Sequence, residues 1–318
     1  MSELSGVVVV DKPSGPTSFD VVRRVKGLFK TRRCGHTGTL DPTATGILPI
    51  CIGDATKIAS YVSDGEKEYD AVVRFGETTD TQDAAGRTLE TRPLGDLTEE
   101  RVREELKAFV GLVDQTPPMY SARKVDGKRL YELARAGEEV EREARQVHID
   151  EARLTSFAPP DVGIFVRCSK GTYLRTLAHD LGQRLGCGAH LKALKRVRVG
   201  PFGLEDSVGL DTLMAAAKEG RPQLEKYLLP LSRALTDLAE LQLDTQLARR
   251  VAHGHAPGPA DLSRLRAPPF SRGRKVRLLD PEGRVLAIGE SDGVGMIKLL
   301  RVLVSGSHDL VGRSSDDE

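Results

Sequence analysis

The chain has 318 residues, of which 39% are hydrophobic and 29% charged, and a formal net charge of +1 at pH 7. This length predicts two domains and at least one substantial core. No apolar run approaches the roughly 18 residues of a membrane span, and the first residues lack the basic head of a signal peptide, so we expect a cytoplasmic protein. The four cysteines show no C-x-x-C spacing, which argues against a zinc site and, in that compartment, against disulfides.

Basic residues are concentrated in three segments. Residues 12–36 hold seven Lys or Arg against Asp20 alone, residues 186–199 hold four and no acid, and residues 264–284 hold seven against two acids. Phosphate contacts come from such clusters rather than from overall charge. A solvated helix face would explain any single cluster equally well. The three together indicate a nucleic-acid partner.

Apolar spacing predicts strands and helices in a mixed order. Gly6–Val10 is a short apolar run that ends in Asp-Lys-Pro, typical of a buried strand stopped by proline. Ser18 can cap a helix with basic residues on its outer face. The apolar face of that helix would hold Phe19, Val22, Val25 and Phe29.

The next elements continue this mixture of strands and helices. We expect a strand over 68–75, a helix capped by Thr98, paired strands over 146–157 and 162–168, and a helix from Thr172 with its leucines on one face. Hairpins and irregular connections, rather than repeated βαβ units, favour an α+β domain with a largely antiparallel sheet.

The texture of the chain changes near residue 250. After a stretch rich in proline and glycine, the apolar runs 276–279 and 285–288 flank Asp-Pro-Glu-Gly, which predicts a hairpin in a small β-rich second domain. We therefore expect a first domain over 1–235, a second over 240–304 and a disordered polar tail over 305–318.

The densest motif runs from Gly35 to Pro49 and reads GHTGTLDPTATGILP. Three glycines and two prolines fix an irregular loop whose backbone can approach a ligand closely, with Asp41 in its middle. Asp followed by Pro is also a good helix start, which would explain Asp41 without any chemistry. The loop could instead hold a phosphate, but no G-K-[ST] follows, which argues against a nucleoside triphosphate.

Two further stretches carry polar or aromatic groups at the ends of predicted strands. CSKGTYLR, from Cys168 to Arg175, follows one strand and opens a helix, and KEY places Tyr69 in another strand. In isolation, Tyr173 and Arg175 are ordinary half-buried residues at a turn, and Tyr69 is a strand aromatic packed on the core.

Together, these motifs resemble the bacterial TruB family of tRNA pseudouridine synthases. The similarity extends in order over roughly residues 6 to 235 and includes DKPSG, GHTGTLDPTATGILP, KEY, TTDTQDAAG, QTPPMYSA and SKGTYLR. It implies an α+β pseudouridine synthase catalytic domain with a mixed, largely antiparallel sheet. It also implies a small C-terminal PUA-like β-barrel that binds RNA, based on residues 249–254 and the hairpin over 275–290.

The resemblance implies that a uridine at position 55 in the T loop of tRNA is flipped out, cleaved from its sugar and re-attached through C5. This isomerisation has no net redox change, so we expect no cofactor and no metal. A carboxylate near C1′ would capture or stabilise the electron-deficient sugar. The implied catalytic residues are Asp41, Tyr69 and Arg175, and the implied substrate-binding residues are His36, Tyr69, Tyr173, Leu194 and Lys12.

Each implied role has a physical reason. Arg175 would favour the ionised form of Asp41, and Tyr69 would stack on the detached uracil, with its phenol available to move a proton. His36 would fill the place that the flipped base leaves in the stack. Tyr173 and Leu194 would complete the pocket, and Lys12 would support its floor.

The expected partner is the T arm of tRNA, with no membrane and no protein partner, and the expected state is a monomer. The same chemistry on another RNA and a noncatalytic RNA-binding or RNA-folding protein remain alternatives. The sequence does not choose between a covalent and a dissociative route.

Overall fold

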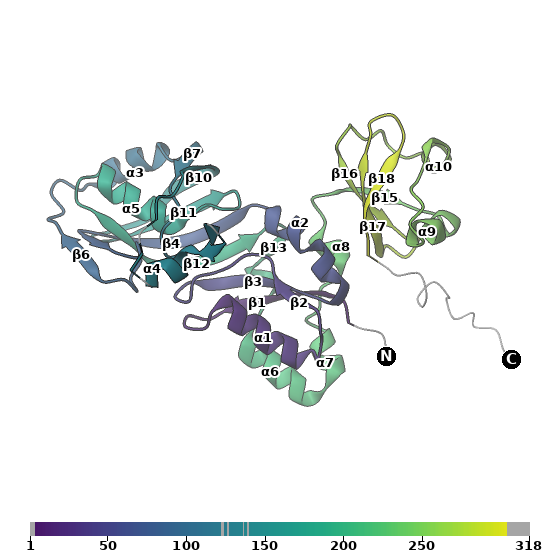
Figure 1. The fold of residues 1–318 in the computed structure, drawn as a ribbon, viewed down its shortest axis with the longest axis horizontal. Helices are drawn as coiled ribbons and strands as arrows, with labels where there is room; N and C mark the ends of the chain where they lie inside the picture. Colours follow the sequence, from purple (N-terminus) through teal and green to yellow (C-terminus); the bar gives the residue numbers. More distant parts are fainter. Residues whose placement is uncertain (1–3, 122–123, 126, 136, 139, 304–318) are drawn as a thin grey trace.

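The computed structural model describes residues 4–121, 124–125, 127–135, 137–138 and 140–303, and a large mixed sheet forms its centre (Figure 1). The strand order is β14-β1-β3-β12-β4-β11-β10-β7, with β13 paired to β12 and β2 paired to β3. The pairs β1–β14 and β3–β12 are parallel, and the others of this sheet are antiparallel. The predicted α+β fold with a largely antiparallel sheet is therefore confirmed.

The strands of this sheet are β1 (Gly6–Lys12), β2 (Cys34–His36), β3 (Thr45–Ile52), β4 (Lys67–Phe75), β7 (Gly111–Gln115), β10 (Arg145–Ala158), β11 (Asp161–Cys168), β12 (Ala189–Val199), β13 (Phe202–Gly203) and β14 (Ser207–Gly209). Two small hairpins stand outside it, β5 (Glu77–Thr79) with β6 (Thr88–Thr91) and β8 (Lys124–Val125) with β9 (Lys128–Arg129). The strands expected over 68–75, 146–157 and 162–168 are confirmed, each within one or two residues of its predicted ends.

Helices cover the two ends of the sheet separately. The helices α3 (Glu99–Lys107) and α5 (Leu174–Arg184) pack with β4, β10, β11 and β12 around one core, and α1 (Ser18–Leu28) and α6 (Leu210–Glu219) pack with β1 and β3 around another (Figure 1). The shorter helices are the 3-10 turns η1 (Gly53–Ile58) and η2 (Leu204–Asp206), and α2 (Ala59–Asp64), α4 (Leu130–Arg135), α7 (Arg221–Glu225) and α8 (Leu231–Ala234).

The start of α1 differs from the prediction in a way that matters for the site. Thr17, not Ser18, caps the helix and accepts a hydrogen bond from the backbone of Asp20 at 3.1 Å. Ser18 is buried, and its hydroxyl donates to the Leu40 carbonyl at 2.9 Å and accepts from the Leu40 amide at 2.8 Å. Phe19 is 70% exposed rather than part of the apolar face. The serine thus joins α1 to the loop that carries Asp41.

The other two predicted helices are present with small shifts at their ends. Thr98 caps α3 as expected, by accepting from the Arg101 amide. The helix predicted from Thr172 begins instead at Leu174, after Tyr173 as N-cap, because Gly171 turns the chain with a φ of +87°. The five leucine and alanine positions expected to face inward are all buried, and these are Leu174, Leu177, Ala178, Leu181 and Leu185.

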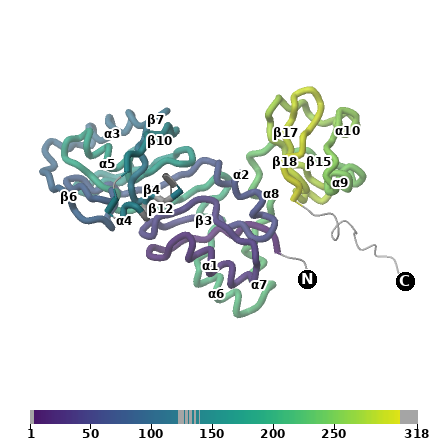
Figure 2. The backbone as a smooth tube through the Cα atoms, in the orientation of Figure 1, coloured from purple at the N-terminus to yellow at the C-terminus, as the bar shows by residue number. Residues whose placement is uncertain are grey.

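A second, smaller sheet follows near the C-terminus (Figure 2). Its strand order is β15 (Ala239–Gln242), β16 (Lys275–Leu279), β17 (Val285–Ser291), β18 (Ile297–Val302), accompanied by α9 (Thr245–Ala252) and α10 (Pro259–Arg264). The predicted hairpin is confirmed as β16–β17. Leu279, Val285 and Ile288 share a core with β1 and η1, so this sheet is anchored to the first. The tail expected over 305–318 lies outside the described residues.

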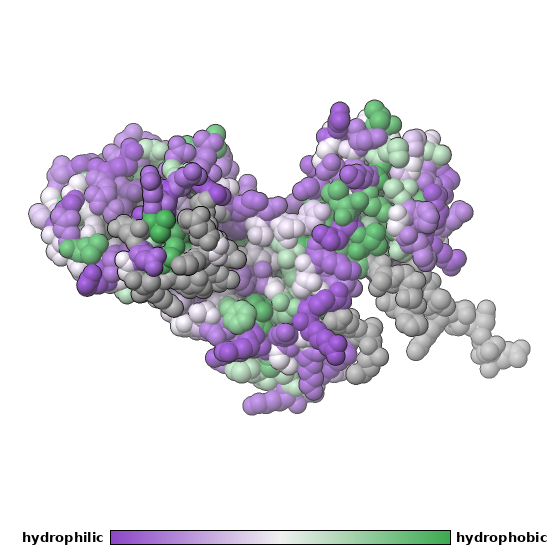
Figure 3. All heavy atoms as spheres, in the orientation of Figure 1, coloured by the Kyte–Doolittle hydropathy of each residue, from purple (hydrophilic) through white to green (hydrophobic). Residues whose placement is uncertain are grey.

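Two further features concern the surface of the molecule and the length of its helices. Figure 3 shows mostly hydrophilic residues on the visible face, which is hollowed between the large sheet and the C-terminal sheet. Within the described part of the chain, no helix is both long and apolar enough to cross a membrane.

Candidate active site

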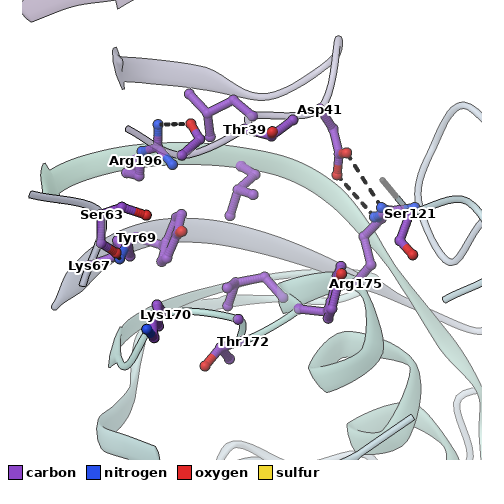
Figure 4. A pocket seen from close by; sticks show the side chains of 16 residues that line it. Thr39, Asp41, Ser63, Lys67, Tyr69, Ser121, Lys170, Thr172, Arg175 and Arg196 are labelled. Carbon is purple, nitrogen blue, oxygen red and sulfur yellow. Dashed lines mark hydrogen bonds and ion pairs between the residues drawn. The ribbon is translucent and has the colours of Figure 1, made fainter. Parts of the chain in front are cut away.

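A pocket of about 340 Å³ opens where the loop before β3 meets β4, β12 and the start of α5 (Figure 4). Five of the predicted residues line it, and these are Asp41, Tyr69, Tyr173, Arg175 and Leu194. His36 and Lys12 are not among its lining residues. The lining also includes Gly38, Thr39, Leu40, Ser63, Lys67, Ser121, Lys170, Gly171, Thr172, Leu174 and Arg196.

Lys12 fixes the loop that carries Asp41. It stands at the end of β1, it is fully buried, and its ammonium donates to the carbonyls of Pro13 at 3.0 Å, Pro42 at 3.0 Å and Ala44 at 2.7 Å. These three acceptors use all three protons of an ammonium. Burial lowers the pKa of Lys12 to about 8, against the opposing effect of the Asp41 carboxylate. The lysine therefore holds the backbone of the Asp41 loop from behind.

The backbone around Asp41 is a turn and not the start of a helix. Residues 42 and 43 form the turn, and β3 begins at Thr45, so the helix-start interpretation of Asp-Pro is wrong. The Ser18 hydroxyl fixes Leu40 on one side of Asp41, and Lys12 fixes Pro42 on the other. The carboxylate is thus presented to the pocket by a backbone that is held at both flanks.

Arg175 holds the Asp41 carboxylate through two contacts. Its Nε lies 3.0 Å from Oδ2, and its Nη2 donates to Oδ1 at 3.4 Å, shown by dashed lines in Figure 4. The guanidinium also donates to the carbonyls of Tyr120 at 2.8 Å and Thr81 at 3.3 Å, and Nη1 lies 3.8 Å from the Asp83 carboxylate. Only 5% of the Arg175 side chain is exposed, against 36% for Asp41. The charge pair is therefore rigid on the arginine side and open to the pocket on the carboxylate side.

Burial, and not the arginine, dominates the titration of Asp41. Burial raises the pKa of the Asp41 carboxyl, Asp83 raises it further, and Arg175 and Lys12 lower it without cancelling the rise. Arg175 acts in the expected direction, but its effect is the smaller one. The carboxylate is consequently more basic than a free aspartate, which suits a group that attacks carbon or accepts a proton.

Tyr69 forms the wall opposite the charge pair. It lies on β4, 8% exposed, and pairs in register with Val166 of β11 and Arg196 of β12. Burial raises the pKa of its phenol, and the neighbouring guanidinium of Arg196 lowers it. Figure 4 places Tyr69 and Arg196 at one end of the pocket and the Asp41–Arg175 pair at the other.

Arg196 is a pocket residue that the sequence analysis placed elsewhere. It belongs to the basic segment 186–199, for which phosphate contacts are predicted, but it is 1% exposed and lines the pocket. Its Nε donates to the Ile47 carbonyl at 2.9 Å, and its Nη2 donates to the Gly38 carbonyl at 3.1 Å. The alternation of a strand contained the signal, because Leu194 and Arg196 are two residues apart and must share a face.

Gln115 is a second residue that the sequence analysis missed. It ends β7, it is 2% exposed, and its side-chain amide accepts from the Tyr173 amide at 3.0 Å and donates to the Tyr173 carbonyl at 3.3 Å. Tyr173 precedes the first turn of α5, which carries Arg175. Gln115 therefore fixes the start of that helix. Gln115 is the first residue of the QTPPMYSA motif. A glutamine at the end of a strand in that motif is the sequence signal that could have indicated this role.

Lysines surround the end of the pocket near Tyr69. Lys67 is buried and donates to the carbonyls of Ser63 at 2.5 Å and Gly65 at 2.6 Å, and burial lowers its pKa to about 8. The exposed Lys170 pairs with Asp64 at 2.7 Å. With Arg196, these side chains make this end of the pocket cationic.

His36 lies beside the loop rather than in the pocket. It ends β2, and its Nδ1 accepts a hydrogen bond from the Gly38 amide at 3.2 Å. Burial and the nearby Arg196 lower the pKa of the imidazole. A neutral ring with its proton on Nε2 fits these contacts. Among the residues that the structure describes, no group of three or more His, Cys, Asp or Glu side chains could hold a metal ion.

The chain is similar to one family over most of its length. The model described as TruB family pseudouridylate synthase (N terminal domain) matches residues 26–174, and that of the tRNA pseudouridylate synthase B C-terminal domain matches residues 175–236. A tRNA pseudouridine synthase B of Burkholderia mallei (strain NCTC 10247) is 46% identical over 305 residues, which cover 96% of this chain and 98% of the relative. One of Pseudomonas aeruginosa (strain UCBPP-PA14) is 45% identical over 95% and 97% of the two chains.

Solved structures support the fold. A chain of the "Crystal Structure of a Cbf5-Nop10-Gar1 Complex" superposes with a TM-score of 0.72 at 24% identity, over 95% of this chain and 85% of that one. A chain of the "Structure of H/ACA RNP bound to a substrate RNA containing 2'-deoxyuridine" gives 0.73 at 23%, over 95% and 86%. At these identities the likeness concerns the architecture alone.

Proposed function

The chain belongs to the TruB family of pseudouridylate synthases and is a tRNA pseudouridine synthase, and from this premise we propose that it modifies uridine 55 in the T loop. The observation that carries the assignment of roles is the Asp41–Arg175 pair, a carboxylate held by a buried guanidinium at one end of a pocket of about 340 Å³. The choice of position 55 rests on the motifs shared with the family.

In this proposal the sugar lies against Asp41 and the base against Tyr69. The C1′–N1 bond breaks with its electron pair on the base, and an Asp41 oxygen captures or stabilises C1′. The base turns over Tyr69, C5 bonds to C1′, the carboxylate is released, C5 loses its proton and N1 gains one. Atoms and electrons balance without a redox partner.

The uridine must leave the folded loop of the RNA to reach this pocket. Extrusion costs roughly a few kcal/mol of stacking and pairing. In this proposal His36, which lies on the short strand that leads into the Asp41 loop, fills the vacated position. Tyr173 and Leu194 line the pocket and complete the walls around the base and sugar.

Contacts with phosphate supply the affinity in this proposal. Arg24, Lys26 and Lys30 are exposed on α1 or just after it, and Lys195 is exposed on β12 beside the pocket. The T arm would lie along this surface, and the PUA-like C-terminal domain over 240–304 would hold its outer part. Action as a single chain in the cytoplasm and a catalytic domain over 1–235 are parts of the same proposal.

The test is tritium release from tRNA transcript labelled at C5 of uridine, followed by mapping of the modified nucleotide. We expect release by the wild type, at position 55, and none by Asp41→Ala. Release that maps to another site or another RNA would overturn the T-loop assignment. Binding without release from any tRNA would favour the noncatalytic alternative.

A further inference from the structure

Arg196 is a buried pocket residue that has no task in the proposed reaction so far. Arg196 is 1% exposed and lines the pocket. Its hydrogen bonds run to two uncharged acceptors, the carbonyls of Ile47 and Gly38. Among the described residues, no carboxylate lies within ion-pair distance of it. A buried charge without a countercharge is costly for the fold, which calls for a reason to retain it.

The backbone around Arg196 is built to hold it closely. Arg196 pairs in register with Tyr69 on one side and with Gly46 on the other. A Cβ at Gly46 would lie 2.2 Å from the Arg196 carbonyl oxygen, so only glycine allows the two strands to approach this far. The position of the guanidinium is therefore fixed before any substrate binds.

The reaction supplies the missing negative charge. When the C1′–N1 bond breaks, the electron pair stays with the base, and uracil becomes an anion whose charge spreads over N1, O2 and O4. Asp41 stands at the sugar end of the pocket, and it cannot stabilise this charge because it is itself negative. Tyr69 and Arg196 stand at the opposite end, where the base would lie (Figure 4). A fixed cation in a water-poor site stabilises developing charge most effectively.

On this basis, which rests on the proposed function, we propose that Arg196 stabilises the detached uracil anion, acting across the Tyr69 phenol as a positioning and electrostatic group. The guanidinium orients the phenol and strengthens it as a hydrogen-bond donor to the base. When C5 bonds to C1′ and N1 is reprotonated, the anion is neutralised and the site returns to its starting charge.

The experiment compares two variants that differ in charge. Arg196→Gln keeps an amide donor for the carbonyl partners but removes the charge, and Arg196→Lys keeps the charge but loses the planar fork. Single-turnover rates are measured with tRNA that carries uridine or 5-fluorouridine at the target position, by digestion and chromatography. The rate is taken from loss of the starting nucleoside, which both bases share, because C5 of 5-fluorouracil has no proton to lose. The fluorine makes the uracil anion intrinsically more stable. Affinity for tRNA and thermal unfolding are measured alongside.

We expect tRNA affinity within about threefold of the wild type for both variants, because phosphate contacts dominate it. The uridine rate should fall roughly 100-fold or more in Arg196→Gln, as for loss of one oxyanion-stabilising donor. The loss of rate in Arg196→Lys should be smaller than this by a factor of about ten or more. The defect of Arg196→Gln should shrink with 5-fluorouridine.

Equal defects on both bases, or equal rates for the two variants, would overturn the inference and leave Arg196 a purely structural residue. If Arg196→Gln does not fold, the leaving-group comparison is made on Arg196→Met, which also removes the charge and decides in the same way. A wild type that is inactive on every tRNA would instead count against the proposed function itself, so the two failures are distinguishable.

Discussion

Replacing Arg175 with methionine should show how much the positive charge of Arg175 contributes to keeping Asp41 ionised. At the observed Nε–Oδ2 distance of 3.0 Å, the pair is worth about 5 kcal/mol at an effective dielectric constant near 20. The Asp41 side chain is 36% exposed to the pocket, so screening by water reduces this. Taking half leaves roughly 2–3 kcal/mol, which corresponds to about a 100-fold shift of the Asp41 equilibrium from the ionised towards the protonated form. Turnover at neutral pH should fall with the ionised fraction.

The pH profile distinguishes this effect from a general loss of structure. Because Arg175 lowers the pKa of Asp41 against the rise caused by burial, its removal should move the acid limb of the single-turnover rate to higher pH. Arg175→Lys should fall between wild type and Arg175→Met, because an ammonium cannot contact both carboxylate oxygens as well as the carbonyls of Tyr120 and Thr81.

A matched control lies on the same helix. Arg184 is half exposed, pairs with Glu105 at 2.6 Å and is not among the pocket-lining residues, so Arg184→Met should change neither rate nor pH profile. An acid limb that stays in place in Arg175→Met would refute the reasoning, since the arginine would then not control the ionisation of Asp41. A similar loss in Arg184→Met would refute it differently, by showing that any change in α5 disables the enzyme.

Four further predictions follow from single contacts. Asp41→Asn should abolish tritium release while tRNA affinity, measured by filter binding, stays within a few-fold; near-normal turnover would remove Asp41 from its role. Tyr69→Phe should slow the chemical step if the phenol moves or donates a proton, and an unchanged single-turnover rate would leave stacking as its task. Arg24→Ala should leave kcat unchanged and reduce the slope of log K against log salt by about 0.7–0.9, whereas an unchanged slope would place α1 away from phosphate. Lys12, with a pKa lowered from 10.5 to about 8, should lose its proton as pH rises through that value. Turnover should then fall as one of three carbonyl contacts is lost, while the contribution of Lys12 to stability rises between about pH 8 and 10.5, because the unfolded chain binds the extra proton there; a stability contribution that falls over this range would contradict the burial argument.

Sequence patterns predicted the elements best where apolar residues alone decide them. The strands around Tyr69 and the pair over 145–168 were found because alternation and the turn between them are local signals. The first residue of α1 was assigned wrongly because Thr17 and Ser18 can both cap a helix. Ser18 does not cap the helix because its hydroxyl is hydrogen-bonded to the backbone amide and carbonyl of Leu40, in the loop before β3. No local pattern contains a partner 22 residues away.

The site residues likewise fall into those that the sequence indicates and those that it does not. Resemblance located the residues that face the pocket with a distinctive chemistry, but Gln115 and Arg196 escaped because their side chains act on backbone groups of distant strands. Both occupy strand positions where the pattern expects an apolar residue. Three buried side chains around the pocket, Lys12, Lys67 and Arg196, have carbonyl oxygens as their hydrogen-bond acceptors.

Such cations make the fold less stable than apolar residues would, because each must give up its hydration for acceptors that carry no full charge. What they provide is a field that exists before the substrate arrives. In the proposed reaction the uracil leaves as an anion beside Tyr69, with Arg196 behind the phenol and a carboxylate at the far end of the same pocket, so the pocket needs positive charge at one end and negative charge at the other. If a sequence is interpreted only by what stabilises the fold, such lysines and arginines are predicted to lie on the surface. A charged residue at a strand position where the alternation predicts an apolar one, beside a pocket residue, therefore indicates an electrostatic role in the site.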